Sequence, residues 1–351
     1  MSTYRIGTFN CKNFIYENDI NKFKWIREII MQTKVDMLLL QEFAAKNKTS
    51  IELPEGWDIE LYHGKWFTKD YSDTASIVTN FDIDLEDDTN KEYMRKPNND
   101  NGYAILWNKA KFELQNFQNI RSVNNLFIKR NTNKKLARPP QIEFFSTSSN
   151  KKNILAVMNT HLTFRGKFSL FVQQIQYFHP DYLRKRDYEK ASKEVKSRVN
   201  EMSELLQLYD SVNNQGSLGV HYTTILGGDF NLPVSDLRSM NNTPKGFPST
   251  TMEYNNIKRN AANEEYNILY AENENKTTLH KVYKEDPLYD YKYHSYDHFI
   301  INQEGCKTEV FDSVKEIKDF YDVSNGDKYP KNDEHYNKLS DHLPVVITVN
   351  L

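Results

Sequence analysis

Short hydrophobic runs recur along the chain, and most of them are apolar at successive positions rather than at alternate ones. Their length and their content of β-branched and aromatic residues predict β-strands. Strands that are apolar on both sides are typical of sheets covered on both faces. The runs are Tyr4 to Phe9, Val35 to Leu40, Tyr103 to Trp107, Ile142 to Phe145, Ile154 to Met158, Thr223 to Leu226, His298 to Ile301 and Leu343 to Val349.

Two other stretches have the three- and four-residue spacing of amphipathic helices. In the first, Asp19 stands where an N-cap is expected, and Ile20, Phe23, Ile26 and Ile30 fall on one face. Because strands outnumber long helices and no repeat of about 20 to 50 residues is present, the pattern predicts a mixed α/β sandwich. The second stretch carries its apolar residues at Ala191, Val195, Val199, Met202, Leu205 and Tyr209.

The length of 351 residues lies above the roughly 250 to 300 residues at which a single core usually stops growing. No Pro/Gly/Ser linker divides the chain, however, and the last strand pattern is similar to the first. We therefore expect a single domain over 1–351. Stretches of low periodicity near 68–101, 164–186 and 241–275 predict surface insertions.

Composition argues against several classes of protein, among them strongly basic polyanion-binding proteins, membrane-spanning proteins and disulfide-rich secreted proteins. The chain has 46 basic and 48 acidic residues, a net charge of −2, so it has no overall positive field to attract a polyanion. No apolar run approaches the roughly 18 residues of a membrane helix, and the N-terminus lacks the basic-then-apolar layout of a secretory signal. We expect a cytoplasmic protein without a transmembrane segment. Cys11 and Cys306, the two cysteines, are too few for a disulfide framework.

Polar residues able to bind a cation or a phosphate stand at the ends of several of the apolar runs, some just after a run and others just before one. Singly, each has an ordinary explanation, such as a turn, a solvated strand end or a hydrogen-bonded histidine. In a layered fold, however, strand ends meet at one rim, and carboxylates gathered there repel unless a cation or protons offset them. Their repeated placement therefore indicates one functional site. The residues are Asn10, Glu42, His161, Asp229, Asn231, Asp297, Asp341 and His342.

The motifs that contain these residues, FN, QE, TH, GDFN, YD and SDH in this order, resemble those of the endonuclease/exonuclease/phosphatase superfamily. That superfamily includes deoxyribonuclease I, exonuclease III, inositol 5-phosphatases and neutral sphingomyelinases. The resemblance runs from Asn10 to His342. It implies an α/β fold, a four-layer α/β/β/α sandwich of the deoxyribonuclease I-like type, with the active site at one edge of the paired sheets. It also implies a metal-dependent hydrolase of phosphoesters.

The resemblance assigns a metal-binding role to three residues. Glu42 is similar to the principal Mg²⁺ ligand of the family, and Asn10 and Asp341 complete that end of the site. All three offer oxygen, which suits Mg²⁺, or Mn²⁺ as a substitute, better than zinc.

Catalytic roles follow from the same resemblance. Asp229 and Asn231 are similar to the pair that orients the nucleophilic water or a second metal and holds the scissile phosphate. His342 is expected to pair with Asp297, and His161 to face the phosphate as a second imidazole. A carboxylate partner fixes the tautomer of an imidazole and favours its charged form, so that it can transfer protons or stabilise a pentacovalent phosphate.

Two further residues are expected to contact the substrate phosphate. The segment ARPPQIEFFS resembles the deoxyribonuclease I segment with a phosphate-contacting arginine, which here is Arg138, although a surface arginine in a Pro-rich turn explains it equally well. Tyr103 falls on the strand that lies beside the active site in the family. The family often has an acidic residue just before this strand, whereas this chain has Asp100 and Asn101, which leaves the partner of His161 open.

Local basic segments favour nucleic acid as substrate. Between Leu114 and Ile142 there are six basic residues and no acidic one, and between Thr163 and Asn200 there are nine basic and four acidic residues interleaved with aromatics. Basic residues suit phosphates and aromatic rings stack on bases, although such segments are often only solvated surface. With ARPPQIEFFS and His161, they favour a DNA endonuclease.

Other substrates stay open. An RNA nuclease with deadenylase-like activity is one alternative, and an enzyme acting on inositol phosphates or phospholipid headgroups is another. Against the inositol branch, SYDHFII lacks the Cys-Asp-Arg arrangement typical of those phosphatases. A catalytically silent binding protein would have lost metal or histidine positions, and none is lost in this sequence.

Overall fold

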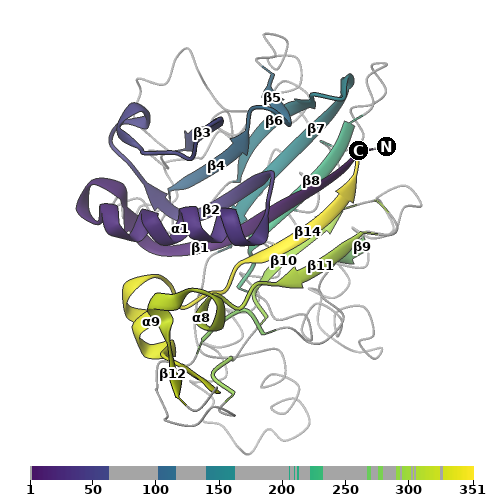
Figure 1. Cartoon of the computed structure of the whole chain (residues 1–351). Helices are drawn as coiled ribbons and strands as arrows, with labels where there is room; N and C mark the ends of the chain where they lie inside the picture. The colour runs from purple at the N-terminus through teal and green to yellow at the C-terminus, as the bar shows by residue number, and fades with distance from the viewer. Residues whose placement is uncertain are drawn as a thin grey trace, which may run out of the picture.

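The protein is described by a computed structural model (Figure 1), which covers residues 2–62, 102–115, 140–162, 205, 209, 212, 222–231, 267–269, 276–279, 290–292, 295–301, 303, 306–324 and 327–351. The predicted insertions at 68–101 and 164–186 lie outside these residues. Most of 241–275 also does, except for one short strand at 267–269.

Two six-stranded sheets form the centre of the molecule. The first sheet has the order β11-β14-β1-β2-β4-β3, and the second has the order β5-β6-β7-β8-β10-β9. The strands of the first are β1 (Thr3–Ile15), β2 (Met37–Ala44), β3 (Trp57–Tyr62), β4 (Tyr103–Asn108), β11 (Lys307–Val310) and β14 (Val345–Asn350). Those of the second are β5 (Phe112–Leu114), β6 (Gln141–Thr147), β7 (Asn150–His161), β8 (Tyr222–Asp229), β9 (Asn267–Leu269) and β10 (Asp297–Ile301).

Every apolar run picked out in the sequence overlaps one of these strands, which confirms the strand predictions. Four strands at or near the sheet edges were not predicted: β3, β5, β9 and β11. They are short or rich in polar residues, and β11 alternates exposed with half-buried positions, so they lack the continuous apolar signal of the central strands.

A shared apolar core joins the inner faces of the two sheets. Ile6 of β1 and Leu39 of β2 come from the first sheet, and Val157 of β7, Ile225 of β8 and Phe299 of β10 come from the second. These side chains are fully buried. Their burial removes large apolar areas from water, which stabilises the pairing of the sheets.

Helix α1 (Ile20–Thr33) covers the outer face of the first sheet (Figure 1). It begins as predicted, because the side chain of Asp19 accepts a hydrogen bond from the backbone N–H of Lys22. The placement of Ile20 on the buried face was wrong, since this side chain is 55% exposed. The buried stripe begins one turn later, at Phe23, and continues through Ile26 and Ile30.

Helical residues of the second predicted helix pack on the outer face of the second sheet. The predicted positions Ala191, Val195, Val199 and Met202 lie outside the described residues. Leu205 and Tyr209 of that helix, and Val212 beyond its predicted positions, are helical and buried, and the Tyr209 hydroxyl donates a hydrogen bond to the Thr224 carbonyl of β8. With helix α1 on the opposite side, this gives the order helix, sheet, sheet, helix. The expected four-layer α/β/β/α sandwich is therefore confirmed.

Smaller elements lie between β11 and β14 along the chain. They are α8 (Ser313–Glu316), the 3-10 helix η6 (Lys318–Phe320), the hairpin of β12 (Tyr321–Ser324) and β13 (Asp327–Pro330), and α9 (Asn332–Lys338). Two further 3-10 helices, η1 (Tyr16–Asn18) and η2 (Lys48–Ser50), follow β1 and β2. None of the helices in the described residues is long and apolar enough to cross a membrane.

Candidate metal and catalytic site

Sheet topology brings the predicted site residues to one edge of the sandwich. β1 and β2 are parallel, so Asn10 and Glu42 share an edge of the first sheet. In the second sheet the parallel pair β7 and β8 places His161 opposite Asp229. Antiparallel β10 starts at the same edge with Asp297 opposite Asp229, and antiparallel β14 begins shortly after His342.

Asn10 joins acidic residues of the two sheets. Its side-chain Nδ2 donates to Asp229 Oδ2 at 2.9 Å and lies 3.3 Å from Glu42 Oε1. The oxygen Oδ1 of Asn10 accepts the backbone N–H of Lys12 at 2.8 Å. The amide thus satisfies two carboxylates that would otherwise repel each other at close range.

The backbone at this edge adopts a left-handed conformation at Lys12, Asn13 and Glu42, with φ angles of 49°, 53° and 56°. The pairing of β1 with β2 shifts register at the same point, between Asn10 and Phe14. The left-handed conformation is unfavourable for residues other than glycine, and residues held in it are often found at functional sites. One result is that the Asn13 N–H donates to Glu42 Oε2 at 2.8 Å and fixes that carboxylate.

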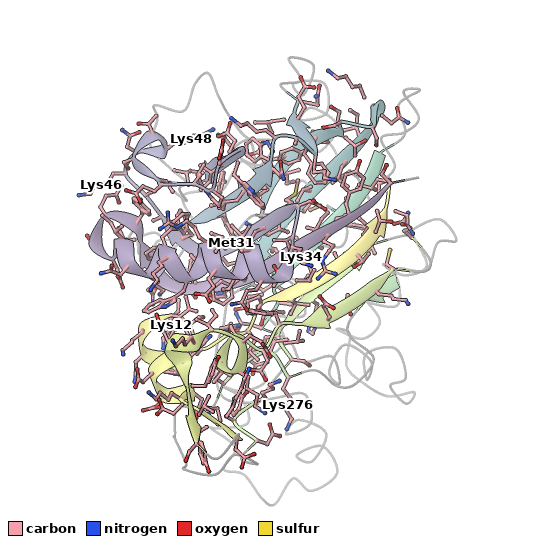
Figure 2. The ribbon with its side chains drawn as sticks, in the orientation of Figure 1. Lys12, Met31, Lys34, Lys46, Lys48 and Lys276 are labelled. Carbon is pink, nitrogen blue, oxygen red and sulfur yellow. The ribbon has the colours of Figure 1, made fainter. Side chains whose placement is uncertain are left out.

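The irregular segment of β1 at Lys12 contacts helix α9; Figure 2 labels the Lys12 side chain beside the C-terminal helices. The ammonium group donates to the Tyr336 carbonyl at 2.7 Å and lies 3.4 Å from the centre of the Tyr336 ring. Helix α9 therefore supports the strand segment that carries Asn10.

His342 and Asp297 form the pair expected from the sequence motifs. Nδ1 of His342 lies 2.8 Å from Asp297 Oδ2, and its Nε2 lies 3.6 Å from Asp229 Oδ2. Burial alone would lower the pKa of His342, but the Asp297 and Asp229 carboxylates outweigh it and raise this pKa well above its ordinary value. The imidazole is therefore held in its charged form.

Asp229 lies at the centre of the site and is almost completely buried. Burial raises its pKa to about 7, although the charge of His342 and the hydrogen bond from Asn10 act in the opposite direction. The backbone N–H of Asn231 donates to Asp229 Oδ1 at 2.9 Å. Asn231 itself has φ 49° and is anchored by its side-chain Nδ2, which donates to the Leu162 carbonyl at 2.7 Å.

His161 is the second imidazole of the cluster. Its Nε2 lies 3.6 Å from Glu42 Oε1 and 3.5 Å from Asp229 Oδ2. Its backbone N–H donates to the hydroxyl of Tyr103 at 3.2 Å. Tyr103, expected to contact phosphate, is almost fully buried in this position. Asp100 and Asn101, the alternatives considered as partners of His161, lie outside the described residues, as does Arg138.

Asp341 is placed differently from the other predicted metal ligands. Within the described residues, the Asn10 amide donates to Glu42 and Asp229 but not to the Asp341 carboxylate. Its negative charge acts on the site by helping to raise the pKa of His342.

Two residues that the sequence reasoning missed hold this C-terminal segment in place. The Ser340 hydroxyl donates to the Asn10 carbonyl at 2.6 Å and accepts the His342 N–H at 3.0 Å. His335 of α9 lies behind it, with Nδ1 2.7 Å from the Ser340 carbonyl and Nε2 2.7 Å from Ser313 Oγ. The serine of SDH was the available sequence signal, whereas His335 has none, since it stands outside every motif.

A metal ion could be held by atoms of this cluster. One atom from each of Asp229, Asp297 and His342 lies within 4.8 Å of the others, and all three residues are buried. The second oxygen of Asp297, Oδ1, is buried and makes no hydrogen bond to another described residue. An unsatisfied buried carboxylate oxygen is a suitable metal ligand.

Comparison with known proteins gave structural matches only. No protein-family model matches the chain, and no curated protein matches it. Among solved structures, a Bacteroides thetaiotaomicron endonuclease/exonuclease/phosphatase family protein matches with 12% identity over 99% of this chain and 97% of that one, at a TM-score of 0.46. This is the family that the sequence motifs resemble.

Two further solved structures match over nearly their whole length. Truncated Caenorhabditis elegans TDP2 is 12% identical over 99% of this chain and 97% of its own, with a TM-score of 0.46. The human Nocturnin catalytic domain, solved with a bound sulfate anion, is 13% identical over 99% and 92%, with a TM-score of 0.44.

Proposed function

We propose that this chain is a metal-dependent phosphodiesterase that hydrolyses the backbone of nucleic acid, with DNA as its polymer and endonucleolytic cleavage as its mode. The observation that carries the proposal is the convergence of Glu42, Asp229 and two histidines at one sheet edge, with side-chain atoms 3.5 to 3.6 Å apart. Carboxylates and imidazoles in this arrangement are suited to hold a hard cation and to move protons around a phosphate.

The donor set fits Mg²⁺, with Mn²⁺ as a substitute. Glu42 would be the principal ligand, and Asn10 and Asp341 would complete the set, all through oxygen. For Asn10 this requires the amide to turn over when the metal binds, because its nitrogen faces Glu42 and Asp229 in this structure and its oxygen accepts the Lys12 N–H. The left-handed backbone at Glu42 turns its carboxylate toward Asn10 and His161. When bound, the cation supplies positive charge that neutralises the non-bridging oxygens and the leaving oxygen.

Asp229 is suited to act as the base for the attacking water. Its pKa of about 7, raised by burial, lies near physiological pH, where a base both exists in its free form and accepts a proton readily. Asn10 and the Asn231 N–H hold its two oxygens in fixed directions. Asn231 would at the same time hold the scissile phosphate.

The two histidines would act on the phosphate itself. Asp297 holds Nδ1 of His342, so the opposite ring nitrogen, Nε2, faces the centre of the site. As a cation, His342 would donate this Nε2–H to a phosphate oxygen as charge develops there. His161 would contribute a second donor from the other side, beside Glu42.

The choice of polymer is supported by the sequence. The basic segments at 114–142 and 163–200 would contact backbone phosphates, and Arg138 would contact the scissile region. Tyr103, which is buried and accepts the backbone N–H of His161, would act on the phosphate by holding His161 in place.

The test is conversion of supercoiled plasmid to nicked and linear forms by the purified protein. Cleavage should require Mg²⁺ or Mn²⁺, stop with EDTA, and be lost in Asp229→Asn. The matched control is Asp322→Asn, which makes the same chemical change at a side chain that is 66% exposed and should keep full activity. Absence of cleavage by wild-type protein with bound metal would refute DNA as substrate and direct the assay to RNA, then inositol phosphates, then lipids.

A further inference from the structure

A layer of three polar side chains lies directly beneath the site, where the apolar core between the sheets ends. Thr8 of β1, Gln41 of β2 and Asn159 of β7 are all fully buried. The next layer deeper is apolar, with Ile6, Leu39 and other residues of both sheets. Burial of amides in such a place is costly unless they are hydrogen-bonded.

Gln41 and Asn159 join the two sheets directly. Gln41 Nε2, from the first sheet, donates to Asn159 Oδ1 of the second sheet at 2.6 Å and to Thr8 Oγ1 at 2.9 Å. This contact connects residues 118 positions apart in the sequence. It is therefore a property of the assembled sandwich and not of either sheet alone.

The backbone fixes the direction of this hydrogen bond. Asn159 Nδ2 donates to the carbonyls of Leu40 and Ala104 at 2.9 and 3.1 Å, which belong to β2 and β4 of the opposite sheet. Since a carbonyl accepts only, the nitrogen of Asn159 has to face them, and its oxygen then faces Gln41. The pair thus has one stable arrangement.

Each member of the layer lies under a site residue. Thr8 and Asn10 are two positions apart on β1, and Asn159 and His161 are two apart on β7, so each pair shares one face of its strand. Gln41 directly precedes Glu42, where the backbone turns left-handed. The three polar residues therefore come from the same three strands as Asn10, Glu42 and His161, and they lie one layer deeper in the sandwich.

The layer is more polar than packing alone requires. Gln41 Oε1 is buried and makes no hydrogen bond to any described residue, so Gln41 leaves one of its polar atoms unsatisfied. An apolar side chain of similar shape would avoid this penalty. The directional contact to Asn159 is what an apolar residue lacks.

We infer that Gln41 and Asn159 are positioning residues, which act through their mutual hydrogen bond to fix the separation of Glu42 and His161. The consequence for turnover rests on the proposed function, whereas the consequence for geometry does not. Errors near 1 Å in the placement of reacting groups reduce rates by about 10²-fold, so the layer would act on kcat rather than on substrate affinity.

The kinetic test removes the hydrogen bond without removing volume. The double variant Gln41→Met, Asn159→Leu should lower kcat by about 10- to 100-fold and leave KM within about threefold. The control is Leu39→Met, an apolar exchange on the same face of β2, one layer deeper, which should keep wild-type kcat. Unchanged kcat in the double variant, or an equal loss in the control, would overturn the inference.

A rescue variant separates positioning from loss of stability. Gln41→Asn alone makes the side chain too short to reach Asn159, and Asn159→Gln alone makes the facing side chain too long for the space, so each single change should lower kcat. The reciprocal exchange, with both changes together, restores the combined reach and should recover most of the lost activity. If the exchange is no better than the single variants, at temperatures where all are folded, the two residues do not act through their contact.

A crystal structure provides a readout that is independent of activity. In the wild type, Glu42 Oε1 lies 3.6 Å from His161 Nε2. The double variant, or the single variants if the double variant does not fold, should change this separation by about 1 Å. An unchanged separation overturns the inference even if no substrate has been found. Absence of hydrolysis by the wild-type protein, with the separation altered in the variant, would instead refute only the proposed function.

Discussion

Asn10 Nδ2 donates to Asp229 Oδ2 at 2.9 Å, and this single hydrogen bond connects residues 219 positions apart on two different sheets. The site is therefore not formed by any one strand or motif. It exists only where the two sheets are paired in the right register, which makes its chemistry dependent on the packing between them.

The first prediction concerns which residues hold the metal. Glu42→Gln removes the negative charge of the proposed principal ligand while keeping its shape, so the affinity for Mn²⁺ should fall about 10- to 100-fold. His342→Ala should change it less than threefold, because this ring pairs with Asp297 in the proposed arrangement. Calorimetric titration with Mn²⁺ measures both.

The reverse pattern would assign the ion to the other candidate set. If His342→Ala abolishes Mn²⁺ binding while Glu42→Gln leaves it intact, the ligands are Asp229, Asp297 and His342, the buried group that also fits a metal ion. Asp341→Asn in the same titration measures the contribution of the third proposed ligand.

The second prediction concerns the imidazoles. His342→Ala and His161→Ala should each lower turnover by about 10² to 10⁴, the usual span for loss of a proton-transferring group. Asp297→Asn should lower it as well, because the amide no longer favours the charged ring. Thermal unfolding first shows whether each variant is folded, and steady-state kinetics then measure its turnover. A histidine variant with near wild-type turnover would remove that residue from the mechanism.

The third prediction is a pH dependence of stability that originates at His335. Burial lowers the pKa of this ring from 6.5 to about 4, and its nitrogens bond to Ser340 and Ser313. The unfolded chain therefore binds a proton at higher pH than the folded one. Keeping His335 neutral therefore adds roughly 3 kcal/mol to the free energy of unfolding. This stabilisation is fully present above pH 6.5 and is lost as the pH falls toward 4.

His335→Gln tests this assignment. Urea unfolding of wild type and variant between pH 7 and pH 4 should show that the variant has lower stability at pH 7 but a flatter decline. Equal slopes in the two proteins would mean that His335 is not the titrating group.

The fourth prediction concerns the basic segment at 114–142. Reversing the charges of Lys134 and Lys135, through Lys134→Glu and Lys135→Glu, should weaken polynucleotide binding and reduce its dependence on salt concentration, because fewer counterions are released. Fluorescence anisotropy at several salt concentrations gives the slope. A slope equal to that of wild type would make this segment ordinary solvated surface.

The central strands could be predicted because their apolar residues are continuous, as in the buried β2. The site residues could be predicted because each stands at one end of such a strand, either just after it, as Glu42 does, or at or before its start, as Asp297 and His342 do. The residues and backbone conformations that hold the site in place could not be predicted. His335 stands in the polar sequence NDEHYNK of α9 and has no motif of its own, and the left-handed backbone at Glu42 has no glycine to signal it. Ile20 fits the helical spacing, yet its exposure depends on where α1 meets the sheet. These features arise from tertiary contacts, which local pattern does not encode.

The pairing of β1 with β14 has a consequence for how the protein forms. β14 lies between β11 and β1 in the first sheet, and the backbone groups of Ser2 and Leu351 bond to each other at 2.9 to 3.0 Å, so the polypeptide is closed nearly into a ring (Figure 1). β14 is translated long after β1, so β1 cannot pair with both of its neighbours until the chain has been made as far as Asn350. Contacts of such long sequence separation slow folding, and the segment that carries His342 can join Asn10 and Glu42 at the site only at that late stage.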